Sequence, residues 1–365
     1  MIPITKPWFP QSMRDEIITD ISDILSSREL MLGKYTELFE SSYSQIAKTK
    51  FAISISSATA GLQIALRYAD VNGGEVLVPA ASFITDITSI QMEGAKPILV
   101  DINPDTLTFD YNDLKKKLSK NTKAIIWVHL TGYIGEEYKK IKAFAKDNGL
   151  FLIEDASHAH GAQVDGKLAG SLGDVGVFSF YPTKIITTGS GGMLTTNNQE
   201  FADFAKSMRL FGKNFETGEV TLQGNDWFLD EFRCCIGFHQ SRYLAANLQR
   251  RRQIAQIYIE NIEKINHVST LKTSKNNLPA WYQFPLFCDD FIDHNALRQN
   301  LNKLGISCKK IYIPIQKEKI FKSFEEQGNF NANEILEKSV CLPIFVDLKD
   351  EDIEKTIETL CDLLI

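Results

Sequence analysis

Between residues 51 and 153 the chain alternates short apolar runs with amphipathic helical patterns, and this alternation limits the folds that it can adopt. The apolar runs occupy residues 51–55, 76–78, 97–100, 124–130 and 150–153. The helical patterns between them occupy residues 60–68, 84–92, 111–118 and 137–148. Because strands separated by helices usually pair in parallel, the pattern predicts an α/β fold with a mostly parallel sheet covered on both faces.

The segments on either side of this region have different patterns. Helical patterns at residues 12–27 and 35–48 precede the first run and predict an arm or an outer cap. Later in the chain we expect a long charged helix over 243–265, a strand over 282–287, and helices near 294–304 and 349–365. We therefore expect an N-terminal arm and a large domain in residues 1–243 and a smaller α/β domain in residues 244–365.

Charge and composition argue against several classes of partner. The 46 acidic and 40 basic residues are spread along the chain, so no basic stripe is available to neutralise a nucleic-acid backbone. No segment approaches the ~20 apolar residues of a membrane span, and residues 1–7 lack the basic-then-apolar order of a secretion signal. The six cysteines show no CxxC spacing, which indicates neither a zinc site nor a disulfide framework. We expect a cytoplasmic protein without a nucleic-acid or membrane partner.

Lys184 and Asp155 are the main candidates for chemistry. Asp155 follows an apolar run and should emerge at the carboxyl edge of the sheet, where α/β folds bind ligands. Lys184 follows a buried run and a Pro-containing turn, which predicts a protected cleft without other cations, where desolvation lowers the lysine pKa. A lysine that forms an imine and a carboxylate that keeps a pyridine nitrogen protonated are both required in a pyridoxal 5'-phosphate (PLP) enzyme. Taken singly, Asp155 could be a helix cap and Lys184 a solvated surface lysine.

Further segments could complete such a site. The turn of small residues that contains Ala58 and Thr59 could bind a phosphate at a helix N-terminus, although Ser or Thr there is more often an ordinary N-cap. Ser179, shortly before Lys184, could supply a hydroxyl to the same phosphate. His158 and His160 have too few neighbouring ligands to indicate a metal site. We expect His158 to donate to, or stack near, the phenolic oxygen of the cofactor.

Several motifs, in this order, resemble the DegT/DnrJ/EryC1/StrS family of PLP-dependent sugar aminotransferases. They are MLGK (31–34), SATAGL (57–62), VPAASF (78–83), GAKP (94–97), EDASHAHGA (154–162), FSFYPTK (178–184) and LPI (342–344). The resemblance covers nearly the whole chain. It implies the type I PLP-dependent transferase fold, the aspartate aminotransferase fold, with a mostly parallel central sheet and a smaller C-terminal α/β domain.

The resemblance also implies roles for individual residues. Lys184 would hold PLP and shuttle protons, Asp155 would pair with the pyridinium nitrogen, and His158 would lie beside O3′. The ring would stack on Phe83, and the phosphate would be bound by Ala58, Thr59 and Ser179. Members of the family are homodimers with sites at the subunit interface. Its dehydratase branch has histidine in place of the lysine, so Lys184 favours transamination.

Two positions depart from the family pattern Gly-x-Asn-x-Arg. Ungapped alignment places Asp226 at the asparagine that reaches the neighbouring subunit's cofactor phosphate, where a carboxylate would be repelled unless it is protonated or turned away. A shift by one residue would give that role to Asn225. Phe228 stands at the arginine suited to an anionic part of the substrate. Its loss could be compensated by Lys309, Lys310 and Tyr312, or these could be solvated surface residues.

These observations give a leading hypothesis and two alternatives. The leading one is a PLP-dependent aminotransferase that moves an amino group, from L-glutamate by family resemblance, to the keto group of a nucleotide-linked sugar. The absence of the arginine at Phe228 keeps open a smaller phosphorylated ketone or aldehyde as the substrate. A third possibility, from another class, is a non-catalytic PLP-binding regulatory module.

Overall fold

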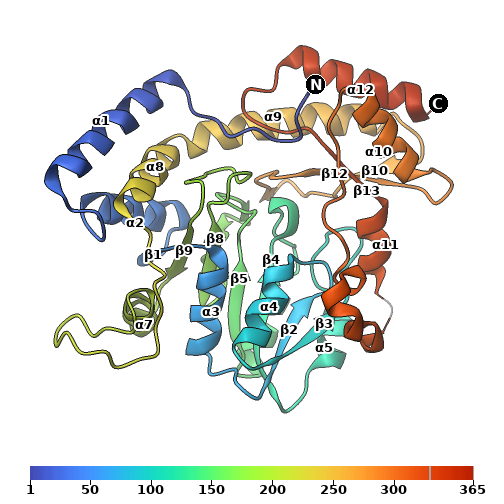
Figure 1. Ribbon diagram of the computed structural model, residues 1–365. Coiled ribbons are helices and arrows are strands. Elements are labelled where there is room, and N and C mark those ends of the chain that lie inside the picture. The colour runs from blue at the N-terminus through green and yellow to red at the C-terminus, as the bar shows by residue number, and fades with distance from the viewer. Residues whose placement is uncertain (329, 365) are drawn as a thin grey trace.

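Within residues 1–328 and 330–364, which the computed structural model describes, a seven-stranded sheet forms the centre of the molecule (Figure 1). In spatial order its strands are β1 (Phe51–Ile55), β9 (Gly192–Thr196), β8 (Val175–Ser179), β5 (Phe151–Asp155), β4 (Thr122–Val128), β2 (Glu75–Pro79) and β3 (Lys96–Val100). β9 runs antiparallel to both of its neighbours, whereas the other neighbouring pairs are parallel. The predicted α/β fold with a mostly parallel sheet is therefore confirmed.

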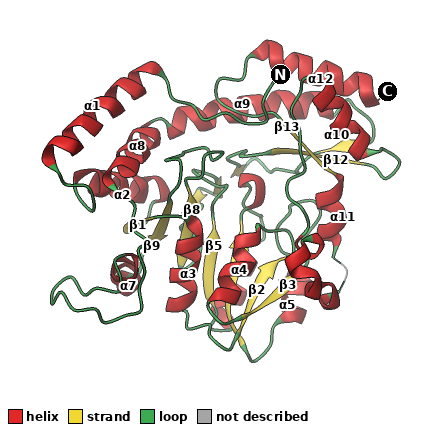
Figure 2. Cartoon of the chain, viewed as in Figure 1, coloured by secondary structure: helices red, strands yellow, loops and turns green. Residues whose placement is uncertain are grey.

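Helices cover both faces of this sheet (Figure 2). One face packs against α3 (Ala58–Tyr68), α4 (Ile84–Met92) and α7 (Gln199–Arg209), and the other against α2 (Lys34–Ala47), α5 (Tyr111–Lys117) and α6 (Tyr138–Asp147). In β2, Val76 and Val78 belong to the first hydrophobic cluster and Leu77 to the second. Because successive strand side chains point to opposite faces, an apolar run without polar alternation is buried on both sides.

The chain departs from its predicted elements after β4. Residues 124–130 were expected to be extended throughout, but β4 ends at Val128 and a 3-10 turn, η1 (Leu130–Gly132), follows. Thr131 has a φ of 60°, a left-handed conformation that a strand does not contain. Its backbone N–H donates to His158 Nδ1 at 3.2 Å, so the turn is tied to the loop that follows β5.

The C-terminal part contains a second, smaller sheet made of β10 (Val268–Ser269), β12 (Phe284–Cys288) and β13 (Ser339–Leu342). Around it lie α9 (Leu244–Ile262), α10 (His294–Lys303), η2 (Ile315–Lys317), η3 (Lys319–Gln327), α11 (Asn331–Lys338) and α12 (Asp350–Leu364). The predicted helix at 349–365 is present up to Leu364, and Ile365 lies outside the described residues. A further ribbon pairs β6 (Gln163–Val164) with β7 (Lys167–Leu168) and β11 (Asn277–Leu278). The boundary between residues 243 and 244 stays a prediction.

The N-terminal helices pack against α8 (Glu231–Arg242), far away in the sequence (Figure 1). α2 has no side-chain cap of its own, and the Glu231 carboxylate instead accepts hydrogen bonds from the N–H groups of Gly33, Tyr35 and Thr36 at 2.7–3.0 Å. A carboxylate at this end also interacts favourably with the helix dipole. The arm is thus fastened by a buried charge that local sequence patterns do not reveal.

α1 (Gln11–Ser27) is held to α8 by a cluster of ionisable side chains. Asp20, Cys235 and His239 lie close enough together to share a metal ion. The two imidazole nitrogens of His239, however, already contact the carboxylates of Asp20 at 2.7 Å and Glu16 at 3.0 Å. Its role in joining the two helices is therefore enough to explain this cluster.

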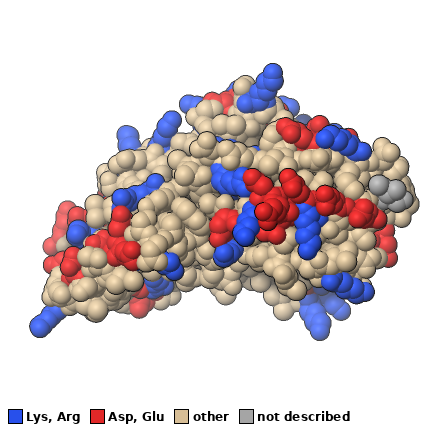
Figure 3. Space-filling view, turned by 90° about the horizontal axis from the view of Figure 1, so that it is seen from above, with Lys and Arg blue, Asp and Glu red and all other residues tan. Residues whose placement is uncertain are grey.

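The surface carries charges of both signs. On the face shown in Figure 3, basic and acidic side chains are interspersed and leave no continuous basic stripe. In residues 1–328 and 330–364, no helix combines the length and apolar character needed to cross a bilayer.

Candidate active site

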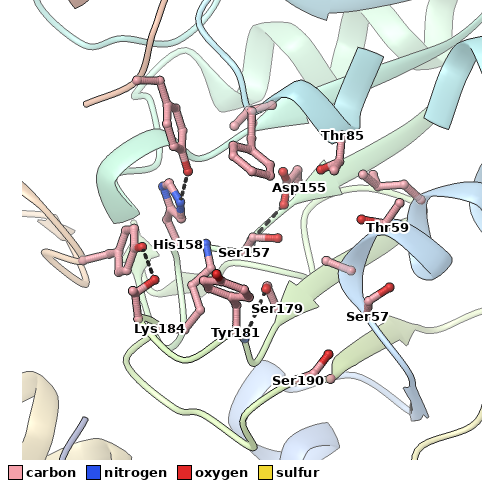
Figure 4. A pocket seen from close by; sticks show the side chains of 18 of the residues that line it. Ser57, Thr59, Thr85, Asp155, Ser157, His158, Ser179, Tyr181, Lys184 and Ser190 are labelled. Atoms are coloured by element: carbon pink, nitrogen blue, oxygen red, sulfur yellow. Dashed lines mark hydrogen bonds between the residues drawn. The ribbon is translucent and has the colours of Figure 1, made fainter. Parts of the chain in front are cut away.

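Loops that follow the carboxyl ends of β1, β2, β5 and β8 meet at one edge of the central sheet and line a cavity of about 510 Å³ (Figure 4). Seven of the predicted site residues line it, namely Ala58, Thr59, Phe83, Asp155, His158, Ser179 and Lys184. Parallel strands end together at one edge, which is why Ala58 and Lys184, 126 positions apart in the sequence, reach one cavity. The C-terminal part adds Tyr282, Lys309 and Tyr312.

The Lys184 amine lies at one end of this cavity, 4.6 Å from the centre of the Tyr282 ring. It makes no hydrogen bond or ion pair with a described residue. Burial lowers the pKa of Lys184 to about 8, Asp155 and Asp86 oppose this shift, and Lys309 adds to it. The expectation of a cleft without other cations was therefore wrong, because Lys309 reaches the same cavity from the C-terminal part.

The lowered pKa leads to a testable prediction about reactivity. With a pKa of about 8, roughly a tenth of the Lys184 amines are neutral at pH 7, against fewer than about one in a thousand for an ordinary lysine. Covalent attachment of PLP to the cofactor-free protein should accelerate about tenfold per pH unit up to about pH 8 and then level off. Stopped-flow absorbance between pH 6.5 and 9.5 measures this rate. A rate that keeps rising to pH 9.5 would contradict the lowered pKa.

Asp155 ends β5 and lies 7% exposed on the cavity wall. Its Oδ1 accepts a hydrogen bond from the Ser157 N–H at 2.9 Å (Figure 4). Beside it lies a second carboxyl, that of Asp86, which is fully buried. Sequence reasoning missed Asp86, because an acidic residue in the first turn of a helix is ordinarily a favourable partner of the helix dipole.

His158 is positioned from several sides. Its Nδ1 accepts from the Thr131 N–H at 3.2 Å, its Nε2 lies 2.6 Å from the Tyr312 hydroxyl, and its ring lies 4.1 Å from that of Tyr282. Burial, and then the charge of Lys184, hold the pKa of His158 well below its usual range. A neutral ring that accepts at Nδ1 carries its proton on Nε2, so His158 donates to Tyr312 in this arrangement.

His160 does not line the cavity. Its Nε2 contacts the Ser179 carbonyl oxygen at 3.0 Å and its Nδ1 lies 2.5 Å from the Tyr43 hydroxyl. With both nitrogens occupied, His160 supports the strand end that carries Ser179.

The opposite end of the cavity is the N-terminus of α3 (Figure 4). Ser57 is the N-cap, and its hydroxyl accepts from the Ala60 N–H at 3.1 Å. The first N–H groups of a helix, here those of Ala58 and Thr59, have no partner within the helix and favour an anion. A Cβ on Gly192 would come within 2.6 Å of the Ser57 carbonyl carbon, so β9 can approach this turn only because residue 192 is glycine.

Phe83 lines the cavity with a partly exposed ring. The residue is 43% exposed, and its ring lies 5.3 Å from that of Tyr312 at an angle of 42°. An exposed aromatic ring beside a ligand cavity is available to stack on a planar group.

Asn225 and Asp226 lie outside this cavity. Both are exposed, and Asn225 Oδ1 accepts from the Asp226 N–H at 2.8 Å. Backbone hydrogen bonds hold Asn225 against Met208 and Phe211. Phe228 does not line the cavity either. The predicted role of Asn225 or Asp226 concerns a neighbouring subunit and stays a prediction.

The residues present fit PLP. The cavity combines an unpaired amine with a lowered pKa, a carboxylate, an exposed aromatic ring and a helix N-terminus able to bind a phosphate. These groups meet at the carboxyl edge of a mostly parallel sheet. Fold and site together define a PLP-dependent aminotransferase with the aspartate aminotransferase fold.

Comparisons with known proteins give the family. A model of the DegT/DnrJ/EryC1/StrS aminotransferase family matches residues 11–361, and the chain belongs to this family. It is 32% identical over 347 residues to dTDP-3-amino-3,6-dideoxy-alpha-D-galactopyranose transaminase of Aneurinibacillus thermoaerophilus, with 94% of each chain covered. It is 29% identical over 325 residues to GDP-perosamine synthase of Escherichia coli O157:H7, with 88% of each covered.

A solved structure gives the same result. The aminotransferase TlmJ from Streptoalloteichus hindustanus superposes with a TM-score of 0.92 at 28% identity, covering 100% of this chain and 99% of that one. The predicted family, fold class, enzyme class and PLP cofactor are confirmed.

Proposed function

We propose that this aminotransferase moves an amino group from L-glutamate to the keto group of a nucleotide-linked sugar. The observation that carries the proposal is the unpaired Lys184 amine in the same cavity as Asp155. Two relatives are named for dTDP-linked and GDP-linked sugars or their synthesis, which supports the substrate class. The comparisons favour neither a smaller phosphorylated ketone nor a non-catalytic regulatory module.

In the proposed mechanism each residue has one task. PLP, when bound, supplies an electron sink for the carbon from which a proton is removed. Lys184 would hold the cofactor covalently and, once freed by an amine substrate, would carry a proton at Nζ to and from the substrate carbon that bears the amino nitrogen. Asp155 would keep the pyridine nitrogen protonated.

The remaining residues of the site orient the cofactor. The N–H groups of Ala58 and Thr59 and the hydroxyl of Ser179 would bind its phosphate, and Phe83 would stack on its ring. His158 directs a Nε2 proton toward the side of the cavity where Tyr312 lies.

Lys309 is the residue that best suits the anionic part of a substrate. It lines the cavity, its side chain is exposed, and it forms no ion pair with a described residue. Lys310, by contrast, is already paired with Glu337. An unpaired ammonium in a partly enclosed cavity attracts a phosphate or a carboxylate, which supports both a nucleotide-linked sugar and a dicarboxylic donor.

A substrate panel tests the proposal. Turnover should be detectable with one or more keto-sugar nucleotides and L-glutamate, with ping-pong kinetics because the two substrates use the same lysine in turn. The comparison set consists of smaller phosphorylated ketones and aldehydes, assayed by 2-oxoglutarate release. Turnover confined to the comparison set would move the substrate assignment to the smaller compounds. Failure of bound PLP to convert to its amine form with any amino donor would support the non-catalytic module.

We also propose a homodimer in which the segment around Asn225 faces the partner's cofactor. Large apolar side chains are exposed in and near this segment, namely Met31, Phe211, Phe215, Val220 and Leu222. Such a surface is typical of a contact between chains. Light scattering should give twice the mass of one chain, and a monomeric mass with full activity would exclude a shared site.

A further inference from the structure

We propose that Asp86 is a positioning residue that stays protonated and donates a hydrogen bond to Asp155, holding Asp155 as a carboxylate directed at the cavity. The inference rests on the proposed pairing of Asp155 with the cofactor's pyridine nitrogen. Asp86 itself does not line the cavity, so it acts through Asp155.

The surroundings of Asp86 carry this proposal. It is the third residue of α4 and is 0% exposed. Its Oδ2 accepts from the Phe83 N–H at 3.2 Å, while its Oδ1 has no hydrogen-bond partner among the described residues. The carboxyl lies within hydrogen-bond reach of that of Asp155. A buried oxygen without a partner is costly, and a proton shared with a neighbouring carboxylate removes this cost.

Charge decides which of the two groups carries the proton. Two buried carboxyls in contact cannot both be ionised, as in the paired aspartates of aspartic proteases. Burial, and then the charge of Asp155, hold the pKa of Asp86 well above its usual range, while the Phe83 N–H and the Lys184 charge act in the opposite direction. Asp155 reaches the cavity and accepts from the Ser157 N–H, so it is the better site for the negative charge.

The consequence is that hydrogen bonds fix the orientation of the Asp155 carboxylate. Asp155 accepts from Ser157 on one side and from Asp86 on another, which restricts the rotation of its side chain. The negatively charged Asp155 carboxylate is then already oriented before the cofactor binds, and it would face the pyridine nitrogen. Such preorganisation improves binding without any contact between Asp86 and the cofactor.

Two substitutions separate this arrangement from its alternatives. Asp86→Asn keeps the shape and offers an amide N–H donor to Asp155, whereas Asp86→Leu keeps approximately the size and removes the donor. Binding of PLP to the cofactor-free variants is measured by fluorescence titration, with thermal unfolding as the control for folding. We expect the dissociation constant of Asp86→Asn to stay within about threefold of the wild-type value and that of Asp86→Leu to rise about tenfold or more.

The outcomes distinguish the possible roles. Unchanged binding by Asp86→Leu would mean that Asp86 has no positioning role. Equal weakening by both variants would mean that Asp86 must be ionised. If the Leu variant does not fold, the pH dependence of PLP binding by Asp86→Asn still decides. Asparagine and a protonated aspartate are both uncharged, so the proposal predicts the same pH profile for Asp86→Asn and the wild type between pH 6 and 9. A profile that differs would overturn the proposal.

A third variant separates failure of this inference from failure of the proposed role of Asp155. In an Asp155→Asn background, Asp86→Leu should weaken PLP binding no further, because the two residues act in series. An additional tenfold loss there would show a role independent of Asp155. If Asp155→Asn alone leaves PLP binding unchanged, the pairing of Asp155 with the pyridine nitrogen is wrong, and the inference about Asp86 fails with it.

Discussion

Replacing Lys184 with alanine is expected to abolish covalent attachment of PLP and to lower the transamination rate by about 10⁴-fold or more. The variant loses both the amine that binds the cofactor and the group that carries the proton. No other described side chain in the cavity combines an amine with the position of Lys184 over Tyr282. The loss should therefore be larger than that of any other single substitution in the site.

Borohydride reduction followed by peptide mass spectrometry measures the attachment. The wild-type protein should carry a pyridoxyl adduct on the peptide that contains Lys184, and the Lys184→Ala variant should carry none. Lys309→Ala is the matched control, because Lys309 lines the same cavity and its removal should leave the adduct in place. An adduct on Lys309, or turnover by Lys184→Ala close to the wild-type rate, would refute the assignment.

The Asp155→Asn variant should keep PLP attached to Lys184 but lose about 10²- to 10³-fold in turnover, a loss comparable to removing one preorganised electrostatic group from an active site. The amide cannot carry the negative charge that keeps the pyridine nitrogen protonated, so the cofactor becomes a weaker electron sink. The substitution changes a charge without changing the shape, and the Ser157 N–H still finds an amide oxygen to bind.

Single-turnover spectroscopy with L-glutamate measures this effect apart from substrate binding. Asp165→Asn serves as the control, because Asp165 is a carboxylate near the surface that pairs with Lys139 away from the cavity. Its turnover should match the wild type. If Asp155→Asn also kept the wild-type rate, Asp155 would have only a structural role at the end of β5.

Much of the fold could be predicted from periodicity. The run at residues 76–78 became β2, and the helical pattern at 84–92 became α4 with the same bounds. These patterns are local consequences of burial, since a strand covered on both faces is apolar throughout and a helix on its surface is apolar along one side. The predicted strand over 124–130 was too long at its C-terminal end, because the chain turns at Leu130–Gly132, where the Thr131 N–H donates to His158.

The sequence by itself determined a mostly parallel sheet with helices on both faces, and the order of its motifs placed Asp155 and Lys184 after strands at the carboxyl edge. Only the tertiary structure decided which distant side chains join them. Tyr282 and Lys309 enter the cavity from the C-terminal part, Asp86 lies against Asp155, and Glu231 fastens α2 across nearly 200 residues. The physical reason is that hydrophobic periodicity records whether a residue is buried, whereas the partner it meets depends on how separate elements pack.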